Sequence, residues 1–168
     1  MVARRLFGML GGCLAVVGVV AVPASADAVQ RNATYRIFWE AVPAYRVVPG
    51  THHTVWAVDS ETGWDHWVLT PVGGSFARPI FQIRNVASDL CLAPALRRAA
   101  SSDVEMAECG TGTEQTWYID PIGPSHSIAL VADPARKIYA NKTTGTAGTL
   151  LEGVIADTSQ SRWIFRRI

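Results

Sequence analysis

Two tryptophans and two aspartates lie together in one short segment of the chain, as Trp56, Asp59, Trp64 and Asp65. An indole ring can stack on the apolar C–H face of a sugar ring, and a carboxylate can accept hydrogen bonds from sugar hydroxyl groups. This combination of residue types predicts a shallow carbohydrate site. The alternative is that both rings fill the core or pack under a loop, and the sequence leaves that alternative open.

A second and weaker set lies nearer the C-terminus. Tyr139, Asn141 and Glu152 offer an aromatic ring, an amide and a carboxylate that could converge on a ligand. Residues of these types are also common on exposed strands and loops, which is the alternative interpretation of all three.

No spacing in the sequence predicts catalysis or metal binding. The histidines lack H-x-x-x-H spacing and no Cys-x-x-Cys pair accompanies them, so we expect no metal and no cofactor. There is neither a G-x-S-x-G motif nor a glycine-rich phosphate loop. Carboxylate pairs such as Asp59 and Glu61 have the spacing of ordinary exposed residues. We therefore expect a binding protein that is not an enzyme. The histidines are His52, His53, His66 and His126.

The elements that must position these residues are short strands. W-V-L-T-P-V-G begins at Trp67, W-Y-I-D-P-I-G at Trp117 and W-I-F-R-R-I at Trp163, at intervals of 50 and 46 residues. Alternating apolar residues after each tryptophan indicate a strand with one buried face, and Pro-Val-Gly or Pro-Ile-Gly marks a turn. Short apolar runs separated by Gly, Pro, Asn, Asp and Ser fill the rest of the chain. The pattern predicts an all-β domain with an internal three-fold repeat.

Each repeat also has a matching start. An opening strand with apolar residues at i and i+2 is followed by a further apolar anchor at i+10. The starts are Tyr35–Ile37 with Tyr45, Phe81–Ile83 with Cys91, and Ile128–Leu130 with Ile138. The predicted repeats span about 35–77, 78–123 and 124–168, with four strands each. A four-stranded unit is too small to bury its own apolar face, so we expect the three units to close around one axis.

Residues 1–26 have the features of a secretion signal. Arg4 and Arg5 precede an apolar run from Leu6 to Val22, and Ala24-Ser25-Ala26 offers a cleavage site. Ala26-Asp27-Ala28 is a second candidate for cleavage. The paired arginines also fit the twin-arginine export motif. We expect a secreted, extracellular protein that is not inserted in a membrane once the signal is removed.

The remainder of the chain is nearly neutral. The whole chain has 15 Lys and Arg against 14 Asp and Glu, and the predicted signal holds two arginines and no acid. The absence of a basic block argues against nucleic acid or an anionic membrane as partner. We expect a monomer in which residues 27–34 form a loose polar arm ahead of a folded domain at 35–168. Two cysteines remain, and in an exported domain Cys91 and Cys109 are expected to form a disulfide.

The middle repeat carries the fullest set of motifs: C-L-A at 91–93, V-E-M-A-E-C at 104–109 and E-Q-T-W at 114–117. The set resembles the ricin B-chain lectin family, whose repeats carry two cysteine-anchored strands and a Q-x-W motif. This resemblance implies a β-trefoil with Trp67, Trp117 and Trp163 in its pseudo-three-fold core. We expect Gln115 of the motif to make structural hydrogen bonds rather than ligand contacts.

The residues that bind sugar in that family are replaced in this chain. The family places an Asp two residues after the first Cys, where the middle repeat has Ala93, the first Val47 and the third Ala140. The aromatic position of the middle repeat is Ala107, and Glu114 stands where the family has Asn. A methyl group cannot accept a hydrogen bond, so the middle repeat should not bind galactose in the way of the family.

Three functions fit these features. The first is a ricin-type carbohydrate-binding module with a glycan as partner, in which ring stacking supplies most of the affinity. The second is a trefoil that binds an extracellular protein, as protease inhibitors of this fold do, through an exposed loop such as Pro49–His53 or Arg97–Arg98. The third is a structural scaffold.

Overall fold

The computed structural model describes residues 29–95, 103–144, 147–154 and 157–168. The predicted signal peptide and the Arg97–Arg98 pair lie outside these residues. In the described part, twelve strands follow one another with only short 3-10 turns among them, so the predicted all-β class is confirmed. Within the same residues, no helix is long and apolar enough to cross a membrane.

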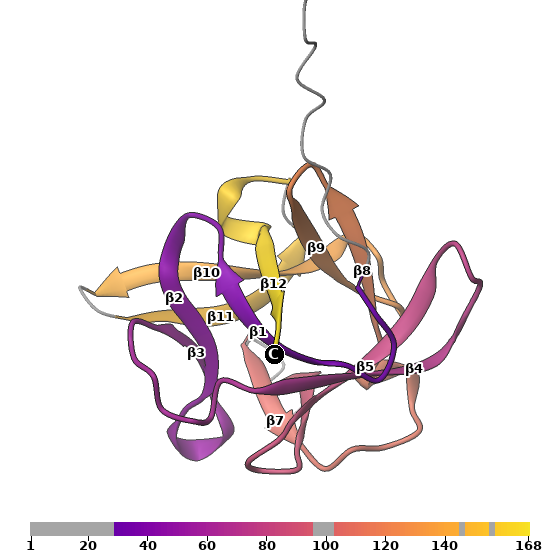
Figure 1. Cartoon of the computed structure of the whole chain (residues 1–168), viewed down its shortest axis with the longest axis horizontal. Coiled ribbons are helices and arrows are strands. Elements are labelled where there is room, and N and C mark those ends of the chain that lie inside the picture. The colour runs from indigo at the N-terminus through magenta and orange to yellow at the C-terminus, as the bar shows by residue number, and fades with distance from the viewer. Residues whose placement is uncertain (1–28, 96–102, 145–146, 155–156) are drawn as a thin grey trace, which may run out of the picture.

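Each predicted repeat contains four strands (Figure 1). The first repeat has β1 (Thr34–Trp39), β2 (Val42–Pro49), β3 (Val55–Val58) and β4 (Trp67–Gly74). The second has β5 (Pro79–Asn85), β6 (Cys91–Pro94), β7 (Val104–Ala107) and β8 (Trp117–Ile122). The third has β9 (Ser125–Leu130), β10 (Arg136–Thr144), β11 (Ala147–Val154) and β12 (Trp163–Arg167).

Six of these strands close into an antiparallel barrel. β1 pairs with β4, β4 with β5, β5 with β8, β8 with β9, β9 with β12, and β12 again with β1. The other six form the hairpins β2–β3, β6–β7 and β10–β11. These hairpins adjoin one another, because β3 pairs with β11 and Thr54 bridges Glu105 on β7. A closed barrel with three such hairpins is a β-trefoil, and the implied fold is thereby confirmed.

The tryptophans that predict the repeats occupy equivalent places in the core. Trp67, Trp117 and Trp163 each begin a barrel strand and are fully buried in one apolar cluster. A buried indole N–H needs an acceptor, and here each one donates to a backbone carbonyl of a hairpin strand in its own repeat. These bonds tie every hairpin to the barrel. The acceptors are the carbonyl oxygens of Val47 at 2.9 Å, Leu92 at 3.2 Å and Ile138 at 3.1 Å, respectively.

The strand register corrects the predicted alignment of the repeats. Trp67 lies opposite Tyr35, Trp117 opposite Phe81, and Trp163 opposite His126. The third-repeat counterpart of Tyr35 and Phe81 is therefore His126, two residues before the predicted Ile128. A shift of two residues along a strand leaves the same face buried, so the alternation of apolar residues could not detect it.

β11 forms in a segment whose composition does not favour a strand. The segment reads A-G-T-L-L-E-G-V, and its two glycines are unfavourable inside a strand. β11 nevertheless pairs along its length with β10, and its start pairs with β3 of the first repeat. Backbone hydrogen bonds to two neighbouring strands thus override the local preference of the sequence.

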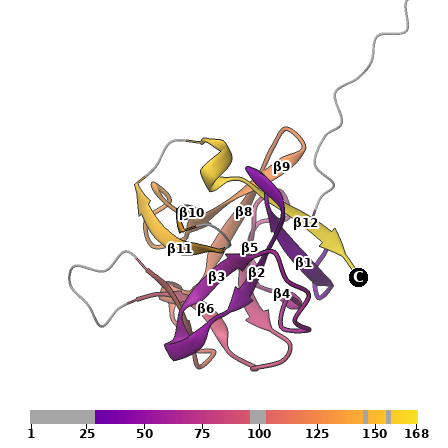
Figure 2. The same ribbon diagram turned by 90° about the vertical axis from the view of Figure 1, so that its left-hand side faces the viewer.

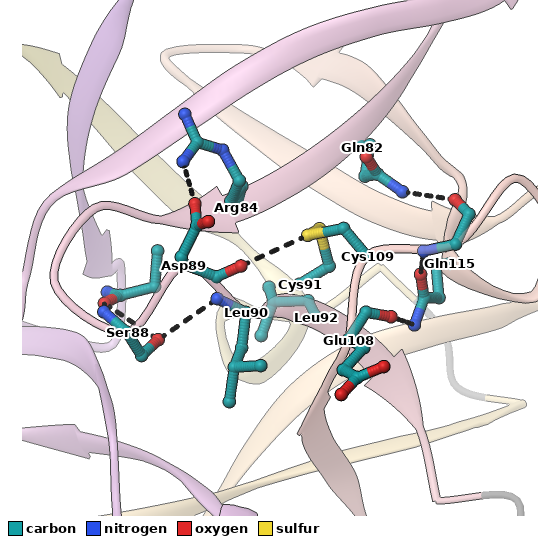
Figure 3. The surroundings of a disulfide bond; sticks show 12 residues. Gln82, Arg84, Ser88, Asp89, Leu90, Cys91, Leu92, Glu108, Cys109 and Gln115 are labelled. Carbon is teal, nitrogen blue, oxygen red and sulfur yellow. Dashed lines mark hydrogen bonds and ion pairs between the residues drawn. A yellow bond between two sulfur atoms is a disulfide. The ribbon is translucent and has the colours of Figure 1, made fainter.

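Each repeat fastens a hairpin strand to the loop before its tryptophan, with different chemistry in each case. In the second repeat, Cys91 and Cys109 form the predicted disulfide across a separation of 18 residues (Figure 3). Like Cys91, Arg46 and Lys137 come directly before the residue whose carbonyl accepts the indole N–H. In the first and third repeats, an ion pair at this position therefore links the hairpin strand to the loop before the tryptophan, as the disulfide does in the second repeat. The pairs are Arg46 with Glu61, at 3.1 Å, and Lys137 with Asp157.

The described part of the predicted N-terminal arm lies against the barrel. The backbone N–H of Asn32 donates to the carbonyl of Leu69 at 2.8 Å, and the N–H of Leu69 donates to Ala33 at 3.2 Å. β1 already begins at Thr34, whose carbonyl accepts the N–H of Ile168 at 3.1 Å. The start of β1 and the C-terminus are therefore adjacent (Figure 2).

Candidate functional site

The loop between β2 and β3 has an unusual backbone. His52 has φ 56° and ψ 38°, and His53 follows with φ 64°, so two consecutive residues other than glycine adopt the left-handed conformation. That conformation costs roughly 1–2 kcal/mol per residue for an L-amino acid. Strain of this kind concentrates at functional sites, where the surrounding structure maintains it. Here the loop is closed by the N–H of Gly50, which donates to the carbonyl of Thr54 at 2.7 Å.

Trp56 supports this loop from β3. Its Nε1 donates to Oγ1 of Thr54 at 2.6 Å, and that hydroxyl donates to the carbonyl of Thr51, also at 2.6 Å. Its ring lies directly on Gly50, where an added Cβ would come within 2.2 Å of the indole. Trp56 is half-buried by these contacts. The residue therefore holds the shape of the loop, which is a role that its sequence position did not reveal.

Two adjoining hollows lie between this loop and the second repeat. One, of about 500 Å³, is bordered by His52, His53, Trp64 and Met106 together with Ser88 and Leu90. The other, of about 580 Å³, extends along β7 and has the same histidines and Met106 as walls. The two hollows share His52, His53 and Met106 as walls, and we call them together the inter-repeat groove. Its remaining polar walls are Glu105 and Glu108.

Trp64 presents an aromatic ring to the groove. The side chain is 47% exposed, which is high for a tryptophan in a small domain. Its backbone is held by Asn85 at the end of β5, whose Nδ2 donates to the carbonyl of Trp64 at 2.7 Å. The Asn85 side chain is fully buried, and its Oδ1 accepts the N–H of Ser88 at 3.1 Å. One buried amide therefore positions two residues of the groove wall.

The sequence pattern did not point to Asn85, and it pointed to His52 and His53 only as part of an exposed loop that could bind a protein. The signal for Asn85 was an Asn that ends an apolar strand just before a turn, since Asn side chains often bond the backbone two or three residues on. The sequence gives no reason to place His52 and His53 beside a ligand site formed with the second repeat. They are exposed, but their left-handed conformation and their place opposite β7 follow only from the fold.

Asp65 does not join Trp64 on the surface. Its side chain is completely buried, with Oδ2 at 3.1 Å from Nε of Arg36 and 3.9 Å from Nε of Arg46. Consecutive residues of an extended chain point in opposite directions, so an exposed Trp64 places Asp65 inside. The carboxylate that was predicted to accept sugar hydroxyls is instead paired with arginines within the first repeat.

Asp59, Tyr139 and Asn141 are not among the residues that border the groove. Asp59 is exposed in the loop after β3. Tyr139 is half-buried and Asn141 exposed, two residues apart on β10. Glu152 is on β11, where its backbone lies opposite Ile138 of β10. The side chain of Glu152 is outside the described part of the structure.

The positions that carry sugar contacts in the ricin-type family offer no equivalent pocket in the second repeat. Ala93 is buried, and Ala107 contributes only a methyl group to the groove. Both ends of the Gln115 amide are used within its own loop (Figure 3): Oε1 accepts the N–H of Gly110 at 2.7 Å, and Nε2 donates to the carbonyl of Glu108 at 2.8 Å. Gln115 therefore closes the loop that precedes Trp117.

The charge of the groove is negative. Glu105 is half-buried and Glu108 exposed, and neither forms an ion pair with a described residue. The two histidines add imidazole nitrogens that can form hydrogen bonds with a ligand. Among the residues that the structure describes, no group of three or more His, Cys, Asp or Glu is arranged to hold a metal ion. The groove combines a flat aromatic ring with imidazoles and free carboxylates, which suits a polar ligand that has one apolar face.

No protein-family model matches the chain, and neither does any curated protein. Solved structures do match. A mosquitocidal holotoxin superposes with a TM-score of 0.72 at 13% identity, over 83% of this chain and 18% of the toxin chain. A Polyporus squamosus lectin, solved with a human-type influenza-binding epitope, has a TM-score of 0.68 at 18% identity, over 83% of this chain and 50% of the lectin.

The Rhizoctonia solani agglutinin matches over its full length. Its TM-score is 0.69 at 13% identity, and the match covers 85% of this chain and 100% of the agglutinin. The chain thus spans less than two thirds of the holotoxin and of the Polyporus lectin, and all of the agglutinin. At these identities the likeness establishes the β-trefoil fold.

Proposed function

We propose that this protein is a secreted, non-catalytic carbohydrate-binding β-trefoil and that the inter-repeat groove is its ligand site. The observation that carries the proposal is Trp64, an exposed indole at the groove wall whose backbone carbonyl is held by the buried amide of Asn85. An exposed aromatic ring beside a hollow offers an apolar face on which a sugar ring can stack. The glycan-binding Polyporus lectin and the Rhizoctonia agglutinin, which share the fold, support the same class of ligand.

The groove charge narrows the class of glycan. Glu105 and Glu108 accept hydrogen bonds from hydroxyl groups or from ammonium groups, and no described cation neutralises them. Glycans with carboxylates or sulfates would meet like charge at this wall. We therefore expect neutral sugars and amino sugars to bind more tightly than acidic ones.

A glycan array followed by titration tests the proposal. The protein should bind at least one neutral or amino-sugar glycan saturably, and Trp64→Ala should weaken that affinity about tenfold or more, as expected for a buried aromatic anchor. Phe76→Ala is the matched control, because it removes an exposed aromatic ring far from the groove walls. An array without binding, or equal losses in the two variants, would contradict the proposal.

Secretion is tested on the exported protein itself. N-terminal sequencing of protein recovered outside the cell should begin at Asp27, or at Val29 if the second cleavage site is used. Retention of Arg4 and Arg5 in the exported chain would refute the predicted signal. Export that persists when the twin-arginine route is blocked would refute that route alone.

One observation favours a second candidate, a trefoil that binds an extracellular protein. The loop residues from Thr51 to His53 are exposed, and hydrogen bonds within the loop hold its backbone. A preformed, protruding loop is what a protease inhibitor offers to its target, since less entropy is lost on binding. Inhibition of a trypsin-like or cysteine protease, together with a silent glycan array, would favour this candidate. A protein silent in both assays would fit the structural scaffold.

A further inference from the structure

A second cavity lies at the end of the barrel where β1 begins. Its volume is about 580 Å³, within the range of ligand pockets. The β4–β5 hairpin forms one wall and the β8–β9 hairpin another. Where the trefoil symmetry would place a third hairpin, the structure has the start of β1 and the C-terminus, and residues 29–31 form the wall. The lining is mostly apolar, with Phe76, Pro79, Phe81, Ile119 and Pro121 among its residues, and it also includes the polar side chains of Gln30 and His126.

Phe76 stands at the rim of this cavity with almost its whole side chain in solvent. It is 94% exposed at the tip of the β4–β5 hairpin. The turn that carries it is ordered, because the N–H of Ser75 donates to the carbonyl of Arg78 at 3.2 Å and the N–H of Arg78 donates to Oγ of Ser75 at 3.1 Å. Removing a phenylalanine side chain from water is favourable, so a ring exposed to solvent next to an apolar cavity is available to cover a ligand.

Arg31 supplies a positive charge at the same rim. Its guanidinium carbon lies 5.9 Å from the centre of the Phe76 ring, and within the described residues it has no ion pair. The nearby Arg78 is different, since it makes two hydrogen bonds to Asp120, at 2.7 and 2.9 Å, and stacks on the ring of Tyr118 at 3.7 Å. The hydrogen bond to Asp120 raises the pKa of Arg78 above its usual value, and partial burial of the guanidinium opposes that rise. Among the described residues that line the cavity, Arg31 is thus an arginine available to a ligand.

We propose that the barrel-end cavity binds a small amphipathic molecule with an apolar body and one anionic group. The body lies against the prolines and the Ile119 side chain, Phe76 folds over it, and the anionic group pairs with Arg31. Apolar lining with a single charged group at the mouth is the usual construction of a ligand pocket in a β-barrel. The site shares no residue with the inter-repeat groove, so it does not depend on the proposed carbohydrate function.

The fluorescent probe 8-anilinonaphthalene-1-sulfonate, an aromatic body with one sulfonate, tests the site directly. With the native protein it should bind saturably at one site, while near-UV circular dichroism and cooperative thermal unfolding remain unchanged. Phe76→Ser and Arg31→Gln should each weaken the affinity about three- to tenfold. Both residues are exposed, so both variants should fold. Trp64→Ala and Arg84→Gln, which alter the groove and an exposed ion pair elsewhere, should leave the affinity unchanged.

Competition separates the contribution of charge from that of apolar contact. Decanoate should displace the probe at lower concentration than decanol, and the difference should disappear in Arg31→Gln. Equal potency of the two competitors on the native protein would overturn the role of Arg31. The whole proposal would be overturned if the probe bound only on loss of the near-UV signal, or with the same affinity in Phe76→Ser. Failure here with normal glycan binding would leave the groove assignment intact.

Discussion

Replacing the two left-handed histidines by glycine should stabilise the protein while weakening its function. Glycine adopts positive φ without penalty, so each replacement relieves roughly 1–2 kcal/mol of backbone strain at His52 or His53. The greater freedom of glycine in the unfolded chain takes back about 0.5–1 kcal/mol at each position. The expected net gain is therefore about 0.5–1 kcal/mol for each variant and about 1–2 kcal/mol for the double variant.

This gain is large enough to measure. The unfolding entropy of a globular protein is about 2.1 cal/mol/K per residue, so for the domain after the predicted signal the double variant should raise Tm by about 3–7 °C. Thermal unfolding followed by circular dichroism gives the shift. Titration with the glycan identified on the array should show weaker binding in the same variants, because two imidazoles have left the groove wall.

Thr51→Gly is the matched control. Thr51 lies in the same loop, is equally exposed and does not have a positive φ. There glycine brings only its entropic disadvantage, so Tm should fall by about 2–3 °C. If His52→Gly and His53→Gly lowered Tm as much as this control does, the left-handed loop would not exist in solution, and the shape of the groove would have to be abandoned.

Three further predictions concern the scaffold around the groove. Removing the disulfide by Cys91→Ser with Cys109→Ser should lower the free energy of unfolding by about 3 kcal/mol, because it frees a loop of 18 residues in the unfolded chain. Denaturant titration measures this loss, and an unchanged unfolding midpoint would refute the prediction. Asn85→Ala should destabilise the protein by about 2–4 kcal/mol, since it leaves buried backbone groups without partners. Asn85→Asp lacks the amide donor and should therefore not restore the lost stability, and chemical denaturation of both variants checks this prediction. Gly50→Ala should displace the indole of Trp56, visible as a changed tryptophan emission spectrum, whereas a spectrum and Tm like those of the native protein would show that the ring does not rest on this glycine.

The tryptophan-ended repeats were predictable because they obey rules that act within one strand. An aromatic residue followed by alternating apolar residues and a Pro-x-Gly turn indicates a half-buried strand wherever it occurs, and three such strands at similar intervals imply three equivalent units. The disulfide was predictable for a related reason, since only two cysteines remained to pair. By contrast, the position of His126 opposite Trp163 was not, because a register shift of two residues leaves the alternation of buried and exposed positions unchanged.

The sequence by itself determined the fold class, the three-fold repeat, the buried tryptophans and the residue types from which a ligand site could be built. The tertiary structure decided which of those residues meet. Trp64 and Asp65 are neighbours in the chain, yet one faces the groove and the other pairs with arginines inside the first repeat. Trp64 and Met106 are far apart in the chain, yet they border the same hollow. The physical reason is that a site on a closed barrel forms between repeats, so its members are selected by strand register and hairpin contacts, which no local pattern of residue types encodes.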